Sequence, residues 1–142
     1  MGSRLMHLAL GKTLAQRLGL SDRFIVGSLL PDAVEGERKR QVNTHFIALF
    51  DEDKYKWFDS IAFYELYKNE IKADPLYLGY YFHLISDNVF RRIFYLDMGL
   101  ISRRGDKRLF EEFYHDYNIL NSMIKKNILS TRRPKFCRSI LI

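Results

Sequence analysis

The chain has 142 residues, of which 47% are apolar and 15% are aromatic, and this composition excludes an intrinsically disordered protein. The formal net charge of +6 is compatible with nucleic acid, phospholipid headgroups or phosphorylated substrates as partners. Because Cys137 is the only cysteine, an intrachain disulfide is excluded.

The beginning of the sequence shows no export-type apolar segment and no small-residue cleavage site. No stretch approaches the roughly 18 apolar residues that a transmembrane helix needs. The sequence therefore predicts a cytoplasmic protein without a transmembrane segment, and it leaves the oligomeric state open.

The first predicted helix spans residues 3–18 and ends at Gly19, a residue type that often closes a helix. Leu10 and Leu14 recur at helical spacing on the same face as His7. This pattern places His7 on a buried apolar stripe.

The second and third predicted helices are separated by a polar loop over residues 35–43. A short helix starts at the capping pair Ser21-Asp22 and ends near Pro31, because the residue before a proline resists the helical conformation. The third helix is expected over residues 54–72, and the sequence predicts no strand pair.

The central helix is predicted over residues 75–98, because Asp74-Pro75 is a strong helix start and Gly99 a natural stop. It is apolar on nearly every side, which is typical of a helix in the middle of a bundle. A further amphipathic helix is expected over residues 106–127. The prediction is an all-α, single-domain multi-helix bundle over residues 1–128, followed by a basic C-terminal tail, residues 129–142.

The most informative pair is His83 and Asp87 on this central helix. A spacing of four residues places both side chains on one face, one turn apart. An ionised aspartate on a buried face costs several kcal/mol unless a charge compensates it, so a shared metal ion is one explanation. The simpler alternative is a hydrogen bond between the two side chains.

Three further residues have the chemistry of metal ligands in apolar surroundings: His7 on the first helix, Asp32 after an apolar stretch, and His45 beside an apolar run. Each of them alone could be a core or capping residue. Together with His83 and Asp87 they form a candidate set of three histidines and two aspartates. Such a set suits zinc, with iron or manganese as alternatives, and paired metals of this kind cleave phosphoesters.

Four segments also resemble the zinc-dependent phospholipase C family, particularly its short unexported bacterial members, and more remotely the fungal zinc-dependent single-strand nucleases. They are residues 3–7 (SRLMH), 27–32 (GSLLPD), 44–46 (THF) and 77–87 (YLGYYFHLISD). The order and spacing agree over about residues 3–90, and the resemblance implies the helical fold of that family.

The resemblance also implies roles for the five candidate residues. Asp32, His45, His83 and Asp87 would hold one zinc ion. His7 and Asp87 would hold a second one, with the N-terminal amine, which could be that of Gly2 after removal of Met1. The aspartate at position 32 would be the catalytic base that activates water for attack on phosphorus.

The chain departs from the family pattern at the remaining zinc position. The family has a histidine six residues after the aspartate of the helix motif, where this chain has Ile93. It also has a later His-x-x-x-acid pair, which this chain lacks, although His115 and Asp116 could take its place or could face solvent. The prediction is therefore one or two bound ions rather than three.

The expected function is a metal-dependent, phospholipase C-like phosphodiesterase, an enzyme whose substrate carries a phosphoester, for example a phospholipid headgroup or a nucleotide. One alternative is a non-catalytic helical module that binds nucleic acid or anionic lipid through two basic segments, residues 91–108 and the C-terminal tail. The other is a His-Asp-type nucleotide phosphohydrolase, suggested by the adjacent His115 and Asp116.

Overall fold

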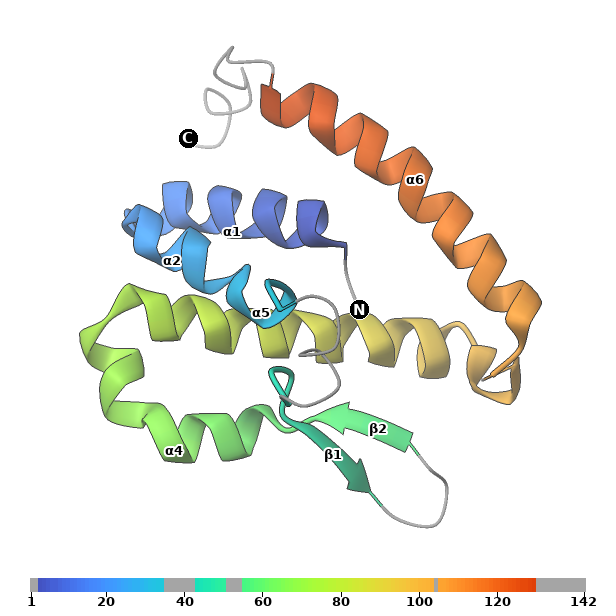
Figure 1. Ribbon diagram of the computed structural model, residues 1–142, viewed down its shortest axis with the longest axis horizontal. Coiled ribbons are helices and arrows are strands. Elements are labelled where there is room, and N and C mark those ends of the chain that lie inside the picture. The colour runs from blue at the N-terminus through green and yellow to red at the C-terminus, as the bar shows by residue number, and fades with distance from the viewer. Residues whose placement is uncertain (1–2, 35–42, 51–54, 104, 130–142) are drawn as a thin grey trace, which may run out of the picture.

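Helix α5 (Pro75–Arg92) runs through the middle of the computed structural model, and the other helices pack around it (Figure 1). The structure describes residues 3–34, 43–50, 55–103 and 105–129. Helices α1 (Arg4–Leu18) and α2 (Asp22–Gly27) lie on one side of α5, and α4 (Ser60–Ala73) lies on the other. Helix α6 (Lys107–Leu129) returns from the far end of α5 to pack against α1. This architecture confirms the predicted all-α, single-domain bundle.

The helix ends follow the sequence signals closely. Ser3 caps α1, because its hydroxyl accepts a hydrogen bond from the backbone N–H of Met6. Gly19 closes α1 with a positive φ of 66°, which glycine adopts without a steric penalty. At the start of α5, Asp74 lies directly before Pro75, and its side chain accepts a hydrogen bond from the N–H of Leu76 at 2.9 Å.

Helices α2 and α5 touch backbone to backbone. A Cβ atom built on Gly79 would lie 2.1 Å from the carbonyl oxygen of Phe24, and one built on Gly27 would lie 2.0 Å from that of Leu76. Only glycine at both positions permits this approach. This contact places α2 against α5. The 3-10 turn (Leu30–Asp32) that follows α2 also packs on α5.

The prediction of one helix over residues 54–72 was wrong at its beginning. Strand β1 (Ile47–Phe50) pairs antiparallel with β2 (Tyr55–Phe58), and α4 starts only after this hairpin. Asp59 ends the hairpin and caps α4, because its side chain accepts from the N–H of Ala62 at 2.8 Å. Trp57, Phe58 and Ile61 are spaced as on a helix, which concealed the boundary.

The central helix lies in the middle of the bundle, as predicted, but its apolar surface is not covered on every side. Ile85, Val89 and Ile93 are 36%, 52% and 48% exposed, so one stripe of α5 faces solvent. The regular helix ends at Arg92 and continues as a π-helical turn (Ile93–Asp97), followed by a 3-10 turn (Leu100–Arg103). Gly99 lies between the two turns with a φ of 68°.

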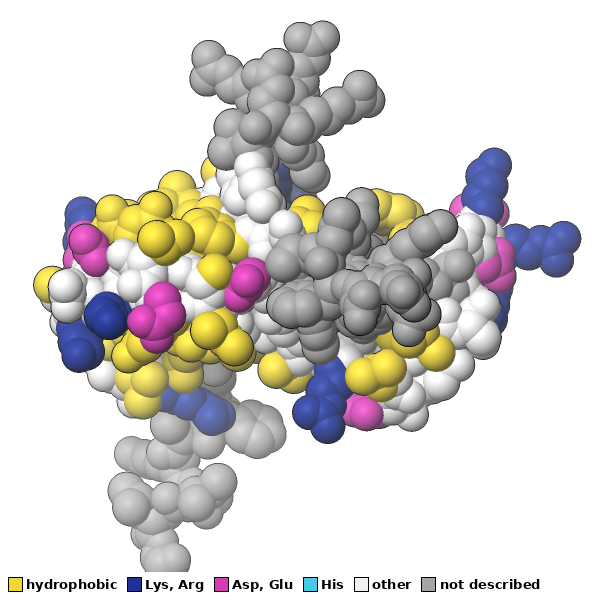
Figure 2. All heavy atoms as spheres, turned by 90° about the horizontal axis from the view of Figure 1, so that it is seen from below, with side chains coloured by type: hydrophobic (Ala, Val, Ile, Leu, Met, Phe, Trp, Pro, Cys, Tyr) yellow, Lys and Arg dark blue, Asp and Glu magenta, His cyan; other side chains and the backbone are white. Residues whose placement is uncertain are grey.

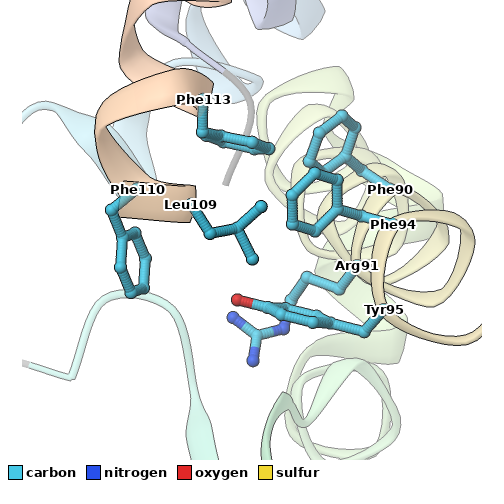
Figure 3. A pocket seen from close by; sticks show the side chains of 7 residues that line it. All are labelled: Phe90, Arg91, Phe94, Tyr95, Leu109, Phe110 and Phe113. Atoms are coloured by element: carbon cyan, nitrogen blue, oxygen red, sulfur yellow. The ribbon is translucent and has the colours of Figure 1, made fainter. Parts of the chain in front are cut away.

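Two apolar clusters hold the bundle together. The first joins β2, α4 and α5 and contains Phe58, Phe63, Ile71 and Leu84. The second joins the end of α5 to α6 around a small pocket, in which the guanidinium of Arg91 lies beside the ring of Tyr95 (Figure 3). Residues 130–142 of the predicted tail lie outside the described residues. Among the described residues, no helix is both long enough and apolar enough to cross a bilayer.

Candidate metal centre

The five predicted residues come from four places in the fold and meet at one position. Helix α1 carries His7, the 3-10 turn after α2 carries Asp32, and α5 carries His83 and Asp87. His45 lies in the turn before β1. The close approach of α2 to α5 brings the 3-10 turn against the central helix, and α1 packs on α2.

The inner part of this cluster is almost inaccessible to solvent. His7, His83 and Asp87 are 2%, 0% and 1% exposed. Nε2 of His7 lies 3.2 Å from Oδ1 of Asp87, and Nε2 of His83 lies 3.7 Å from Oδ2 of the same carboxylate. The two imidazole rings stack with their centroids 3.8 Å apart.

The outer part of the cluster is partly exposed to solvent. Nε2 of His45 lies 3.2 Å from Oδ1 of Asp32 and 3.3 Å from Nε2 of His83. The side chains of His45 and Asp32 are 15% and 18% exposed. Solvent therefore reaches the cluster from the side of these two residues.

The spacing of the donor atoms matches a metal site. His7, His83 and Asp87 offer donor atoms within 4.8 Å of one another, as do Asp32, His45 and His83. Nitrogen and oxygen atoms at about 2.0–2.1 Å from a tetrahedral ion lie about 3.3 Å from one another. The contacts of 3.2–3.3 Å in the cluster are close to that value.

The imidazole of His83 is oriented by a group that can only accept a hydrogen bond. Its Nδ1 lies 2.8 Å from the carbonyl oxygen of Ser28, so Nδ1 carries the proton and donates it. Burial and the neighbouring His7 lower the pKa of His83 to about 4, which keeps the ring neutral near pH 7. Its Nε2 therefore presents a lone pair to the cluster, as metal-binding histidines do.

The inward nitrogen of His7 makes no hydrogen bond to any described residue, although Oδ1 of Asp87 is close by. A buried polar atom without a partner is rare in folded proteins and calls for an explanation. Burial would raise the pKa of Asp87, but hydrogen bonds and nearby positive charge, with His7 the largest of these influences, together hold this pKa well below its usual value. The carboxylate is thus ionised within a buried cluster.

The turn that carries His45 is held in place by several contacts. The hydroxyl of Tyr80, one helical turn before His83, donates a hydrogen bond to the carbonyl oxygen of Thr44. Phe46 has a φ of 49°, a left-handed conformation that costs a residue with a Cβ about 1–2 kcal/mol. Strain of this kind is common where a backbone positions a functional side chain.

Asp32 combines partial exposure with negative charge. Burial alone would raise its pKa, but the hydrogen bond that it accepts from His45 and the nearby imidazoles of His83 and His7 lower it below the usual value. The carboxylate is therefore ionised at neutral pH.

The residues present fit a divalent metal ion. The donor set contains imidazole nitrogens and carboxylate oxygens and no thiolate, which suits zinc, iron or manganese. Nε2 of His7, which makes no hydrogen bond to a described residue, and the inward lone pair of His83 could both bind one cation. Because Nδ1 of His83 is bonded to Ser28, this ring can bind only one ion.

Three other positions considered from the sequence do not contribute donors to either group. Ile93 is half-exposed and apolar, and His115 and Asp116 are exposed on α6. The Gly2 amine lies outside the described residues. Sequence reasoning missed the orienting groups, namely the Ser28 carbonyl, Thr44, Tyr80 and Ser86. Tyr80 and Ser86 had a sequence signal, because each lies one helical turn from His83.

Comparison of the chain with models of protein families, with curated proteins and with solved structures finds no match.

Proposed function

We propose that this protein is a metal-dependent hydrolase of phosphoester bonds, with zinc as its expected ion and similar in kind to phospholipase C. One observation carries the proposal. The fully buried Nε2 of His7, which has no hydrogen-bond partner among the described residues, lies together with the lone pair of His83 and the carboxylate of Asp87. A cation between them could be bound by all three groups.

A zinc ion in such a site supplies Lewis-acid activation of water and of a phosphoryl oxygen. The protein's own residues would divide the remaining work. His7, His83 and Asp87 would hold the ion away from bulk water, because they are almost fully buried. Asp32 and His45, on the open side, would face the substrate.

Asp32 is the best candidate for the general base. Nε2 of His45 lies 3.2 Å from its Oδ1, and this contact fixes the plane of the carboxylate. The other carboxylate oxygen could accept a proton from the attacking water at the open side. The lowered pKa of Asp32 keeps it ionised for that role at neutral pH.

The alternative of a basic binding module receives less support from the described residues. Arg103 pairs with Asp106 at 3.0 Å, and Lys107 lies 3.9 Å from Glu111. On the face shown in Figure 2, the Lys and Arg side chains are interspersed with Asp and Glu. The nucleotide phosphohydrolase alternative relied on His115 and Asp116, which are exposed on α6.

The proposal is tested by metal analysis and by hydrolysis of a chromogenic phosphodiester. Protein purified without chelator should contain one or two ions per chain and should release the chromophore. The variants His83→Ala and Asp87→Ala should lose both the metal and the activity, because each removes a donor atom from the buried group.

The chain offers matched control variants for this experiment. His115→Ala and Asp116→Asn change the same residue types at exposed positions on α6, and they should retain wild-type metal content and activity. A metal content below about one-tenth of an ion per chain in the wild type would contradict the proposal. So would activity that survives in both cluster variants.

A further inference from the structure

Ser86 lies between the two buried histidines of the cluster without being a ligand itself. It follows His83 by three residues on α5 and precedes Asp87. Its Oγ lies 2.9 Å from the carbonyl oxygen of His83 and 3.4 Å from Nδ1 of His7. The same helix therefore supplies two candidate ligands and an oxygen that contacts the histidine of α1.

The direction of these hydrogen bonds follows from the chemistry of the groups. A carbonyl oxygen can only accept, so the hydroxyl of Ser86 must donate its one proton to His83. Toward His7, the oxygen of Ser86 can then only accept. A neutral His7 ring that makes this hydrogen bond carries its proton on Nδ1, so that Nε2 keeps its lone pair.

We propose that Ser86 is a positioning residue that holds His7 in the tautomer able to bind metal. This inference rests on the proposed metal-dependent function. Without the Ser86 oxygen, the favoured tautomer would carry the proton on Nε2, where Oδ1 of Asp87 is 3.2 Å away. The resulting N–H would occupy the lone pair that the ion needs.

The first measurement is made on chelator-treated protein, so that it does not depend on bound metal. Long-range proton–nitrogen correlation spectra distinguish the two tautomers of a histidine ring. In the wild type, His7 should be protonated on Nδ1. In Ser86→Ala the proton should move to Nε2, and in Ser86→Thr, which restores the hydroxyl, it should return to Nδ1.

The second measurement is zinc affinity by competition with a chromogenic chelator. Ser86→Ala should bind zinc about 10–100-fold more weakly, the usual effect of losing a group that orients a ligand. Ser86→Thr should remain close to the wild type. Ser122→Ala is the matched control, because Ser122 donates to a helix carbonyl at 2.9 Å in the same way but is exposed on α6.

The outcomes separate this inference from the proposed function. If the wild type is protonated on Nε2, or if Ser86→Ala changes neither tautomer nor affinity, the role of Ser86 is overturned. If the tautomer moves as expected but no protein binds zinc, the role of Ser86 in orienting His7 is supported and the metal-dependent function is contradicted. A loss of affinity shared by Ser122→Ala would overturn the inference, because it would show a general effect on the helices.

Discussion

Helices α2 and α5 are joined by polar contacts at two places that differ in their chemistry. At the exposed end, Nε of Arg23 donates to the carboxylate of Asp74 at 2.9 Å. In the buried middle, the carbonyl of Ser28 accepts from His83, whose other nitrogen presents a lone pair to the cluster that contains Asp87. The first contact pairs a carboxylate with a guanidinium cation. The second brings together a carboxylate and imidazole nitrogens, which are groups that can donate electron pairs to a metal ion.

This difference separates a self-contained ion pair from a cluster that, on the proposed function, binds a metal ion. An exposed ion pair is complete in itself and contributes little to stability, because water screens it. A buried cluster of donors is costly unless something positively charged joins it. The predictions below test this distinction, beginning with the largest expected effect.

The largest effect is expected from zinc itself. A ligand that binds only the folded state, at about 1,000 times its Kd, stabilises that state by about 4 kcal/mol. For a chain of this size, the thermal midpoint should rise by on the order of 10 °C. Thermal unfolding with zinc and after chelation measures the difference.

A matched pair of variants assigns this response to the cluster. His83→Leu should abolish the zinc-dependent rise, and His115→Ala should leave it intact. An equal rise in His83→Leu would mean that zinc binds elsewhere, and the comparison between the two contacts would then fail.

The fold was predictable wherever a local signal decides the structure. Gly19 and the pair Asp74-Pro75 marked the end of α1 and the beginning of α5. The apolar stripe expected on α1 was wrong, because Leu10 is 47% exposed and the buried face consists of His7, Gly11 and Ala15. The hairpin was missed because residues 55–58 also fit a helical repeat, and only tertiary packing decides between the two. The solvent-facing stripe of α5 was missed for a related reason, since apolar composition alone does not show what covers a helix.

The candidate ligands were predictable, but their orientation was not. The spacing of His83 and Asp87 predicted a shared face, because both lie on one helix. The positions of His7, Asp32 and His45 relative to them depend on the packing of three other segments. The tautomers depend on groups such as the Ser28 carbonyl, a backbone atom that no sequence pattern reveals.

The second prediction concerns the backbone contact that places Ser28 beside His83. In Gly79→Ala, the new Cβ would meet the Phe24 carbonyl at 2.1 Å and the Ser28 nitrogen at 2.9 Å. Because backbone atoms cannot move aside cheaply, we expect a loss of about 3 kcal/mol or more in the free energy of unfolding. The displacement of α2 should also weaken zinc binding.

Urea denaturation and chelator competition measure the two consequences of Gly79→Ala. Gly99→Ala is the control, because its Cβ would meet nothing within 4 Å and only the positive φ of 68° opposes it. That variant should lose about 1–2 kcal/mol and keep its zinc affinity. Equal losses in the two variants would argue against a steric contact between α2 and α5.

The third prediction concerns the outer part of the cluster. Tyr80→Phe removes the hydroxyl that donates to the Thr44 carbonyl and leaves the ring in place. We expect a loss of about 1 kcal/mol in stability, the usual size of one hydrogen bond, and weaker zinc binding through a looser His45. Tyr64→Phe, in a ring that packs against Tyr81, is the control, and unchanged zinc affinity in Tyr80→Phe would show that His45 does not need this bond.

The smallest effect is expected at the exposed ion pair between Arg23 and Asp74. The variant Asp74→Asn removes the charge but keeps the helix cap, because the amide oxygen can still accept a hydrogen bond from the N–H of Leu76. The hydrogen bond from Arg23 lowers the pKa of Asp74 from 3.8 to about 2. A lowered carboxyl pKa stabilises the folded state fully above pH 3.8, and this contribution is lost as the pH falls through about 2. The urea midpoint of Asp74→Asn should therefore lie slightly below that of the wild type at pH 7, and the difference should shrink in high salt and vanish near pH 2.

The rise in thermal midpoint on adding zinc should be the same in both proteins, because the ion pair contributes no donor to the cluster. A changed zinc response in Asp74→Asn would mean that the two polar contacts between α2 and α5 are coupled, and the exposed pair would then be part of the functional site.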